Sequence, residues 1–203
     1  GFCCPGALDC LSKANRETGK IQDGEQTRFR CFQASAEAVY PSLRNMVWNN
    51  FEAIRQHGND VVKIAEEICA SLPAYFNVCR IHIGGDFFSQ SYFDAWLEVA
   101  KRNPSKIFYA YTKSLNFWLA REKEIPSNFV LTASRGGRFD HLIDAHGLKC
   151  SEVVFSEAEA AEKGLEIDHD DSHAAIGKKS FALLLHGVQP KGTEAAEALK
   201  QIK

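Results

Sequence analysis

The sequence predicts an α/β fold: an open partial barrel or a curved, mostly parallel sheet of about five strands, with flanking helices and a cysteine-rich N-terminal loop. From residue 77 onward, strand, loop and helix alternate about five times at intervals of about 20–30 residues, which is typical of parallel β/α units. Five units cannot close an eight-stranded barrel. Apolar residues make up 45% of the 203 residues, enough for a packed core without disulfides.

The part of the chain before the β/α units divides into two regions. Residues 1–35 read as a loop region, because prolines and glycines interrupt any regular period. Residues 36–76 are predicted to be helical. One helical stretch, 35–58, ends at a glycine suited to a C-cap, and the next, 59–73, begins with an Asn-Asp cap. We expect both regions and the β/α units of 77–203 to form a single domain, 1–203.

The β/α units follow in a regular order. Strands are expected where β-branched and aromatic residues cluster, and helices where apolar residues recur at helical spacing. The predicted strands are 78–85, 106–114, 128–137, 151–156 and 181–187. The predicted helices are 89–104, 115–124, 138–147, 156–164 and 193–203.

Charge and composition exclude several classes of protein. The formal net charge is −2 and the chain has no block of like charges, so no nucleic-acid-binding surface is evident. No apolar run reaches the about 20 residues that span a bilayer, so no membrane partner is expected. The seven cysteines are odd in number and unevenly spaced. This pattern is unlike a secreted disulfide framework and favours a reducing cytosol.

Candidate site residues follow the predicted strands, because parallel α/β folds gather their functional groups at the carboxyl ends of the strands. Gly84, Gly85 and Asp86 end the first strand, and two glycines there would allow close approach of a ligand to the backbone. Lys113 and Arg135 end the second and third strands, so we include both as cofactor-binding candidates. The alternative interpretation is that these residues only build turns and helix caps.

Three cysteines of the N-terminal loop are candidate metal ligands. Cys4, Cys10 and Cys31 lie where no amphipathic period would make them core residues. Of the adjacent pair at residues 3 and 4 we favour Cys4, because Pro5-Gly6 turns the backbone directly behind it. The remaining cysteines are unsuitable by position. Cys69 belongs to the apolar stripe of a helix, and Cys79 and Cys150 lie at the amino ends of strands.

The spacing of the loop cysteines indicates which kind of metal centre they could bind. A structural zinc site usually has four ligands in C-x₂-C pairs, and the chain has no such pair. Soft thiolates without that spacing favour an iron–sulfur cluster. The alternative is that these cysteines simply lie in a loop.

Several motifs of the chain resemble the gene-product-88-like family of tailed phages. The matching strings are CCPGALDC, RCFQAS, RIHIGGDFFSQSYFDAW and FYAYTKS, in that order. Two later strings, IDHDDSHA and FALLLHGVQPKG, resemble a marine branch of the family. The resemblance covers nearly the whole chain and implies a phage-encoded protein.

That family in turn resembles radical S-adenosylmethionine enzymes, in which three cysteines bind a 4Fe–4S cluster and a Gly-Gly-Glu strand end holds the methionine amine. This resemblance implies that Cys4, Cys10 and Cys31 are cluster ligands and that Gly84–Asp86 is a segment for S-adenosylmethionine. The chain departs from the enzyme pattern. Its cysteines are spaced C-x₅-C-x₂₀-C instead of C-x₃-C-x₂-C, Asp replaces Glu, and five β/α units replace six.

The fourth iron position could be filled by S-adenosylmethionine, by water or by a protein group. Among protein groups we favour His186, which ends the fifth strand and is followed by a glycine. His169 and His173 come next. Their acidic stretch also suits a divalent metal ion or a solvated loop. His82, in the middle of the first strand, is expected to be structural.

The sequence therefore predicts a phage-encoded protein that binds a 4Fe–4S cluster, with a redox role or a radical-enzyme-like activity. Enzymatic activity stays open at this point. The alternatives are a zinc-stabilised binding module, a non-catalytic structural protein of the virion, and a metal-free thiol enzyme with Cys10 or Cys31 as nucleophile. The expected partner is an electron donor or another phage or host protein. The expected location is the host cytoplasm or the virion.

Overall fold

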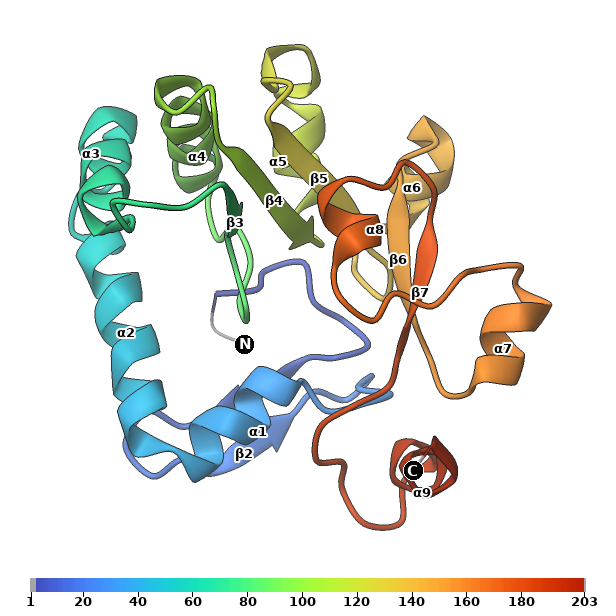
Figure 1. The fold of residues 1–203 in the computed structure, drawn as a ribbon. Coiled ribbons are helices and arrows are strands. Elements are labelled where there is room, and N and C mark those ends of the chain that lie inside the picture. The colour runs from blue at the N-terminus through green and yellow to red at the C-terminus, as the bar shows by residue number, and fades with distance from the viewer. Residues whose placement is uncertain (1–2, 203) are drawn as a thin grey trace.

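The computed structural model describes residues 3–202 and is built around a parallel sheet in the order β3-β4-β5-β6-β7. The sheet curls into a half-barrel with helices around its outside (Figure 1). Its strands are β3 (Val78–Arg80), β4 (Ile107–Thr112), β5 (Phe129–Ser134), β6 (Cys150–Val154) and β7 (Phe181–Leu184). The predicted α/β class and the curved, five-stranded parallel sheet are confirmed.

The helices between the strands cover the convex face of the sheet (Figure 1). They are α4 (Gln90–Arg102), α5 (Leu115–Leu119), α6 (Asp140–His146) and α7 (Glu157–Glu162), with a short 3₁₀ turn η1 (Glu122–Glu124) after α5. Capping by serine fixes two of their starts. Ser89 accepts a hydrogen bond from the Tyr92 amide at α4, and Ser156 accepts one from the Glu159 amide at α7.

Alternate residues of each strand face opposite sides of the sheet. In β4, Phe108 and Ala110 pack on the convex side in the main core with α4, whereas Tyr109 and Tyr111 face the concave side. The concave side is filled in part by the small helix α8 (Ser172–Ala175), whose Ala174 packs against Tyr109 (Figure 1). The main core therefore lies on the outside of the half-barrel, and the inside carries polar groups beside a smaller apolar cluster.

The N-terminal third of the chain begins at the carboxyl ends of the strands and then runs to the convex side, where it ends beside α4 (Figure 1). It comprises the antiparallel hairpin of β1 (Ser12–Ala14) and β2 (Ile21–Asp23), followed by α1 (Phe32–Val39), α2 (Pro41–Arg55) and α3 (Val61–Ser71). The chain ends in α9 (Glu194–Ile202). None of the helices in residues 3–202 is both long and apolar enough to cross a membrane.

Several boundaries differ from the sequence-based expectation. The predicted helix at 35–58 is two helices, because Pro41 has no amide hydrogen and starts a new helix after the extended Tyr40. The first strand ends at Arg80 instead of Gly85. The hairpin β1–β2 and the helix α8 were not predicted. Both are very short elements without a clear period.

Candidate functional site

A cavity of about 250 Å³ opens at the carboxyl ends of the strands, between the sheet and the N-terminal segment. All but one of the predicted site residues line it: Cys4, Cys10, Cys31, Gly84, Gly85, Asp86, Lys113 and His186. Arg135 is not among the lining residues. Thus the three cysteines, 27 residues apart from first to last, share one cavity with the strand-end residues.

The first two cysteines are positioned by a segment that crosses the ends of β3, β4 and β5. Its backbone bonds to the loop after β3 through Asp86 N to Cys3 O, 3.1 Å, and to the loop after β5 through Asp9 N to Gly136 O, 3.0 Å. Close packing of backbones is also required. A Cβ added at Gly6 would lie 2.4 Å from the carbonyl oxygen of Lys113. Cys4 and Cys10 therefore sit on a rigid bridge across the mouth of the half-barrel.

The hairpin β1–β2 brings the third cysteine back to the first two. Its strands pair Ser12 with Asp23, and the Arg28 amide then bonds to the Asp9 carbonyl at 2.8 Å. The Cys31 amide donates to the Ser12 hydroxyl at 3.3 Å. The 20 residues between Cys10 and Cys31 are thus mostly a hairpin that leaves and returns to the same place. Despite the unusual sequence spacing, all three cysteines line the same cavity.

All seven cysteines are free thiols, and those of the mouth influence one another. Burial raises the pKa of Cys10, the nearby Cys31 raises it further, and the positive charge of Lys113 opposes the shift. Cys4 and Cys31 also line a second, smaller cavity with Cys3. Among residues 3–202, no three His, Cys, Asp or Glu side chains are close enough together to hold one metal ion.

The segment Gly84–Asp86 lines the cavity, but its residues also have structural partners. A side chain at Gly85, which has a positive φ of 95°, would come within 2.9 Å of the Cys3 sulfur. The buried carboxylate of Asp86 accepts hydrogen bonds from the Thr112 hydroxyl and the Lys113 amide, each at 2.7 Å. Burial raises the pKa of Asp86, against these hydrogen bonds. The glycines allow the cysteine segment to approach, and Asp86 ties β3 to β4.

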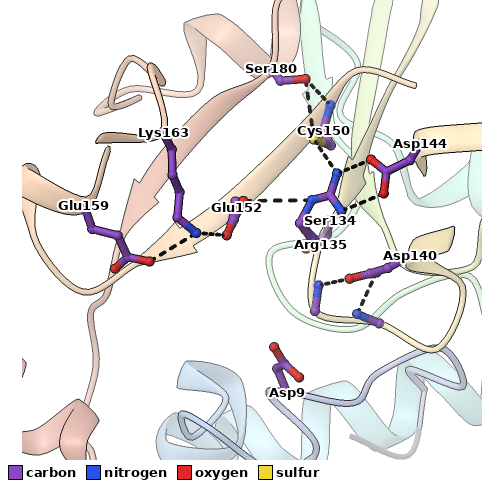
Figure 2. A network of polar contacts seen from close by, with 12 residues as sticks. Asp9, Ser134, Arg135, Asp140, Asp144, Cys150, Glu152, Glu159, Lys163 and Ser180 are labelled. Carbon is purple, nitrogen blue, oxygen red and sulfur yellow. Dashed lines mark hydrogen bonds and ion pairs between the residues drawn. The ribbon is translucent and has the colours of Figure 1, made fainter. Parts of the chain in front are cut away.

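The two predicted basic residues are held by protein groups. The Lys113 ammonium donates to the Ser134 carbonyl, the Ser134 hydroxyl and the Arg135 carbonyl at 2.9, 3.0 and 2.6 Å. Arg135 turns away from the cavity and pairs with Asp144 at 2.8 Å and Glu152 at 3.9 Å, within a network that continues to Lys163 (Figure 2). Lys113 therefore supplies positive charge near Cys10, whereas Arg135 joins β5, α6 and β6.

The predicted histidines separate into two groups. His186 lines the cavity, and its ring stacks at a tilt on Phe32, the residue after Cys31, with centroids 5.1 Å apart. Partial burial and the charge of Arg80 lower the pKa of His186, which favours the neutral, ligand form. His173 instead pairs with Glu166 at 3.0 Å. His169 is not among the lining residues.

Several lining residues were not predicted as site residues, and four of them have contacts that bear on the site: Arg80, His82, Tyr111 and Asp171. Arg80 and Tyr111 alternate with residues that face the convex side, so their period-2 pattern carried a signal for the concave face. Asp171 comes from the acidic stretch after α7 and reaches the cavity because its loop folds under the sheet. His82, expected to be structural, bonds to Tyr92 through Nε2 at 3.1 Å, and its buried Nδ1 has no partner within residues 3–202.

Comparison with known proteins identifies the family. A Gene 88 protein of Mycobacterium phage L5 is 29% identical over 191 residues, which are 89% of this chain and 66% of that protein. A Gene 88 protein of Mycobacterium phage D29 is 28% identical over 123 residues, which are 56% of this chain and 43% of the relative. The chain thus spans just under two thirds of one relative and less than half of the other. No solved structure matches it significantly. The model of the family described as Gene product 88 matches residues 2–202, and the chain belongs to this family.

Proposed function

We propose that the chain is an iron–sulfur protein whose 4Fe–4S cluster is held by Cys4, Cys10 and Cys31 at the mouth of the half-barrel. The observation that carries the proposal is the convergence of three free thiols from two separate segments on one cavity. Core cysteines would have no reason to meet there, because the apolar core lies on the other face of the sheet.

The donor set fits a cluster better than a single ion. Zinc would need four ligands around one centre at about 2.0–2.3 Å. No three such side chains among residues 3–202 meet that condition. A 4Fe–4S cluster gives each cysteine its own iron atom, so its thiolates lie farther apart. This consideration favours the cluster over the zinc-stabilised module, the second hypothesis from the sequence.

Charges and apolar groups around the thiols also suit a cluster. Burial raises the pKa of Cys10, and the positive charge of Lys113 opposes this shift and would help to stabilise a cluster-bound thiolate. Phe29, Phe32 and Leu185 line the same cavity and would shield the cluster from water. When bound, such a cluster supplies one-electron redox chemistry.

The fourth iron position separates two versions of this function. In the first, His186 binds the fourth iron and the protein transfers or senses electrons. In the second, S-adenosylmethionine binds there and the protein is radical-enzyme-like. We favour the first, because the Asp86 carboxylate that would receive the methionine amine already accepts hydrogen bonds from Thr112 and Lys113. The electron partner would be a phage or host protein in the host cytoplasm or the virion.

Anaerobic purification followed by metal and sulfide analysis tests the proposal. We expect about four iron and four sulfide per chain, and a broad visible absorption that bleaches on reduction. A colourless protein that contains one zinc ion would contradict the cluster and support the zinc-stabilised module. A metal-free protein in which Cys10 or Cys31 alone is rapidly alkylated would contradict the cluster and support a thiol enzyme.

Cysteine variants test the ligand assignment. Cys4→Ala, Cys10→Ala and Cys31→Ala should each abolish cluster incorporation. Cys3→Ala is the matched control for Cys4→Ala, because Cys3 is adjacent in sequence but does not line the main cavity. Cys69→Ala, Cys79→Ala and Cys150→Ala should also keep normal iron. Normal iron in Cys31→Ala would contradict the assignment.

His186→Ala and S-adenosylmethionine distinguish the two versions. If His186 binds the fourth iron, the variant should keep the cluster with a changed reduction potential and oxygen sensitivity. Formation of 5′-deoxyadenosine from S-adenosylmethionine under reducing, anaerobic conditions would instead establish the radical-enzyme version.

A further inference from the structure

The inner wall of the cavity carries a guanidinium group that is held from three sides. Arg80 donates through Nε to the His82 carbonyl at 2.9 Å and through Nη1 to the Asp171 carboxylate at 2.8 Å. Its guanidinium also lies over the ring of Tyr111, 5.0 Å from the centroid. These contacts fix the orientation of the group. Within residues 3–202, the second terminal nitrogen, Nη2, has no hydrogen-bond partner.

The carboxylate that holds Arg80 is itself firmly placed. Asp171 accepts hydrogen bonds from Tyr109 at 2.9 Å and Tyr111 at 2.8 Å, in addition to Arg80. Its φ of 63° is the single positive value of a non-glycine residue among residues 3–202. Such a conformation costs free energy, and it is kept where surrounding contacts determine it. The negative charge of Asp171 is shared between Arg80 and the two tyrosine hydroxyls. It therefore offsets the positive charge of Arg80 only in part.

The other cations that line this cavity have partners of their own. Arg30 pairs with Asp23, and the Lys113 ammonium donates to the Ser134 and Arg135 carbonyls. Burial and the Arg80 charge lower the pKa of His82 to about 3, so this ring is neutral near pH 7. The rest of this wall is apolar and includes Val153, Leu183 and Leu185. A cation with a free donor beside apolar side chains is an arrangement that selects anionic groups attached to an apolar body.

We propose that this cavity binds a small organic anion, with its carboxylate or phosphate group on Arg80 Nη2 and its apolar part against Tyr111, Leu183 and Leu185. The cavity volume of about 250 Å³ favours a small metabolite, because pockets for drug-sized ligands measure about 300–1,000 Å³. The ligand would face the three cysteines across the same cavity. The inference goes beyond the proposed cluster and does not require it, because none of its contacts involves a thiol.

Ligand-observed NMR on the full chain tests this inference with a matched set of probes. The set is 3-phenylpropionate, phenethyl phosphate and the neutral 3-phenylpropionamide, each at millimolar concentration. We expect at least one of the two anions to bind. The amide should bind at least tenfold more weakly, because a hydrogen bond to a charged group contributes about 1.5–3 kcal/mol. The anion that binds more tightly shows whether the negative group of the ligand is a carboxylate or a phosphate.

Arg80→Gln should weaken binding of the preferred anion about tenfold or more. Arg121→Gln is the matched control, because Arg121 also pairs with an aspartate, Asp94 at 2.9 Å, and both arginine side chains are 32% exposed. Arg121 lies on the convex side, so its variant should bind normally. If Arg80→Gln does not fold, chemical-shift changes at Tyr111 and His82 of the unmodified chain serve instead.

Three results would overturn the inference: no binding of either anion, equal binding of the amide, or unchanged affinity in Arg80→Gln. The measurements are made on metal-free protein and repeated on anaerobically purified protein. A protein that never takes up iron but binds the anion would contradict only the proposed cluster. A protein with a full cluster that ignores the anions would contradict only this inference.

Discussion

The two faces of the sheet are built on different principles, although the same strands form both. On the convex face, Phe108 and Ala110 of β4 lie in the main hydrophobic core. On the concave face, Tyr109 and Tyr111 of the same strand bond to a carboxylate. Neighbouring residues of β4 therefore belong to different environments, one to the apolar core and the next to a polar network.

This difference separates stability from recognition. The convex core buries large aromatic side chains, among them Phe87, Phe93 and Phe108, each 0% exposed. Such burial is the main favourable contribution to folding. The concave network buries less apolar surface and orients Arg80 toward the cavity. We therefore expect substitutions on the convex face to lower stability strongly, and those on the concave face to change binding more than stability.

The largest effect is expected for Phe108→Ala. Phe108 is 0% exposed and packs edge-on against Phe76 and at a tilt against Trp96. Its truncation should lower the free energy of unfolding by about 3–5 kcal/mol, because it loses apolar burial and leaves a cavity. Urea denaturation measures the change. A loss below about 1 kcal/mol would mean that the convex face does not carry the core.

An intermediate effect is expected at the rim where the two faces meet. Asp86→Ala would leave the Lys113 amide and the Thr112 hydroxyl without their buried acceptor. A buried group left without a partner costs about 1–3 kcal/mol, so we expect a loss of about 2 kcal/mol in unfolding free energy. Asp86→Asn, which keeps an acceptor oxygen, should cost less. Equal stability of Asp86→Ala and the unmodified chain would show that Asp86 is free for a ligand.

On the concave face, Tyr111→Phe should lower the unfolding free energy by about 1 kcal/mol, the usual net contribution of one hydrogen bond. It should weaken binding of the organic anion in addition, because Asp171 then holds Arg80 less firmly. Tyr75→Phe is the matched control, because Tyr75 is 95% exposed and its change should affect neither quantity. A Tyr111→Phe variant that loses as much stability as Phe108→Ala would remove the distinction between the faces.

The fold was largely predictable because its signal is local and repeated. The apolar stripes of α3 and α4, the Asp60 and Ser89 caps, and the alternation in β4 are all readable in sequence. The hairpin β1–β2 was not predictable. Its strands have three residues each, and the Asn15 side chain organises its turn by accepting hydrogen bonds from the Glu17 and Thr18 amides. A short polar hairpin and a loop have the same composition.

The candidate site was predictable only in part. The rule that functional groups lie at strand ends found the lining residues Lys113 and His186, because their position depends on the strand alone. It could not find Asp171, which depends on how a loop after α7 folds back under the sheet to meet Arg80. Arg135 shows the opposite error. It follows a strand as expected, but Asp144 and Glu152 turn its side chain to a different surface (Figure 2).

The smallest effect is expected from His173, which holds the loop that carries Asp171. Its imidazole lies 3.0 Å from Glu166 and 3.4 Å from Asp168, and these carboxylates raise the pKa of His173 above its ordinary value. A raised pKa in the folded state means that charged His173 stabilises the protein. This contribution is complete below about pH 6.5 and is lost as the pH rises through the raised pKa. His173→Gln should therefore lower stability at low pH and leave it unchanged at high pH, as measured by urea denaturation across that range. A constant difference between the two proteins at every pH would show that the loop is held by packing of His173 on Phe181 and not by its charge.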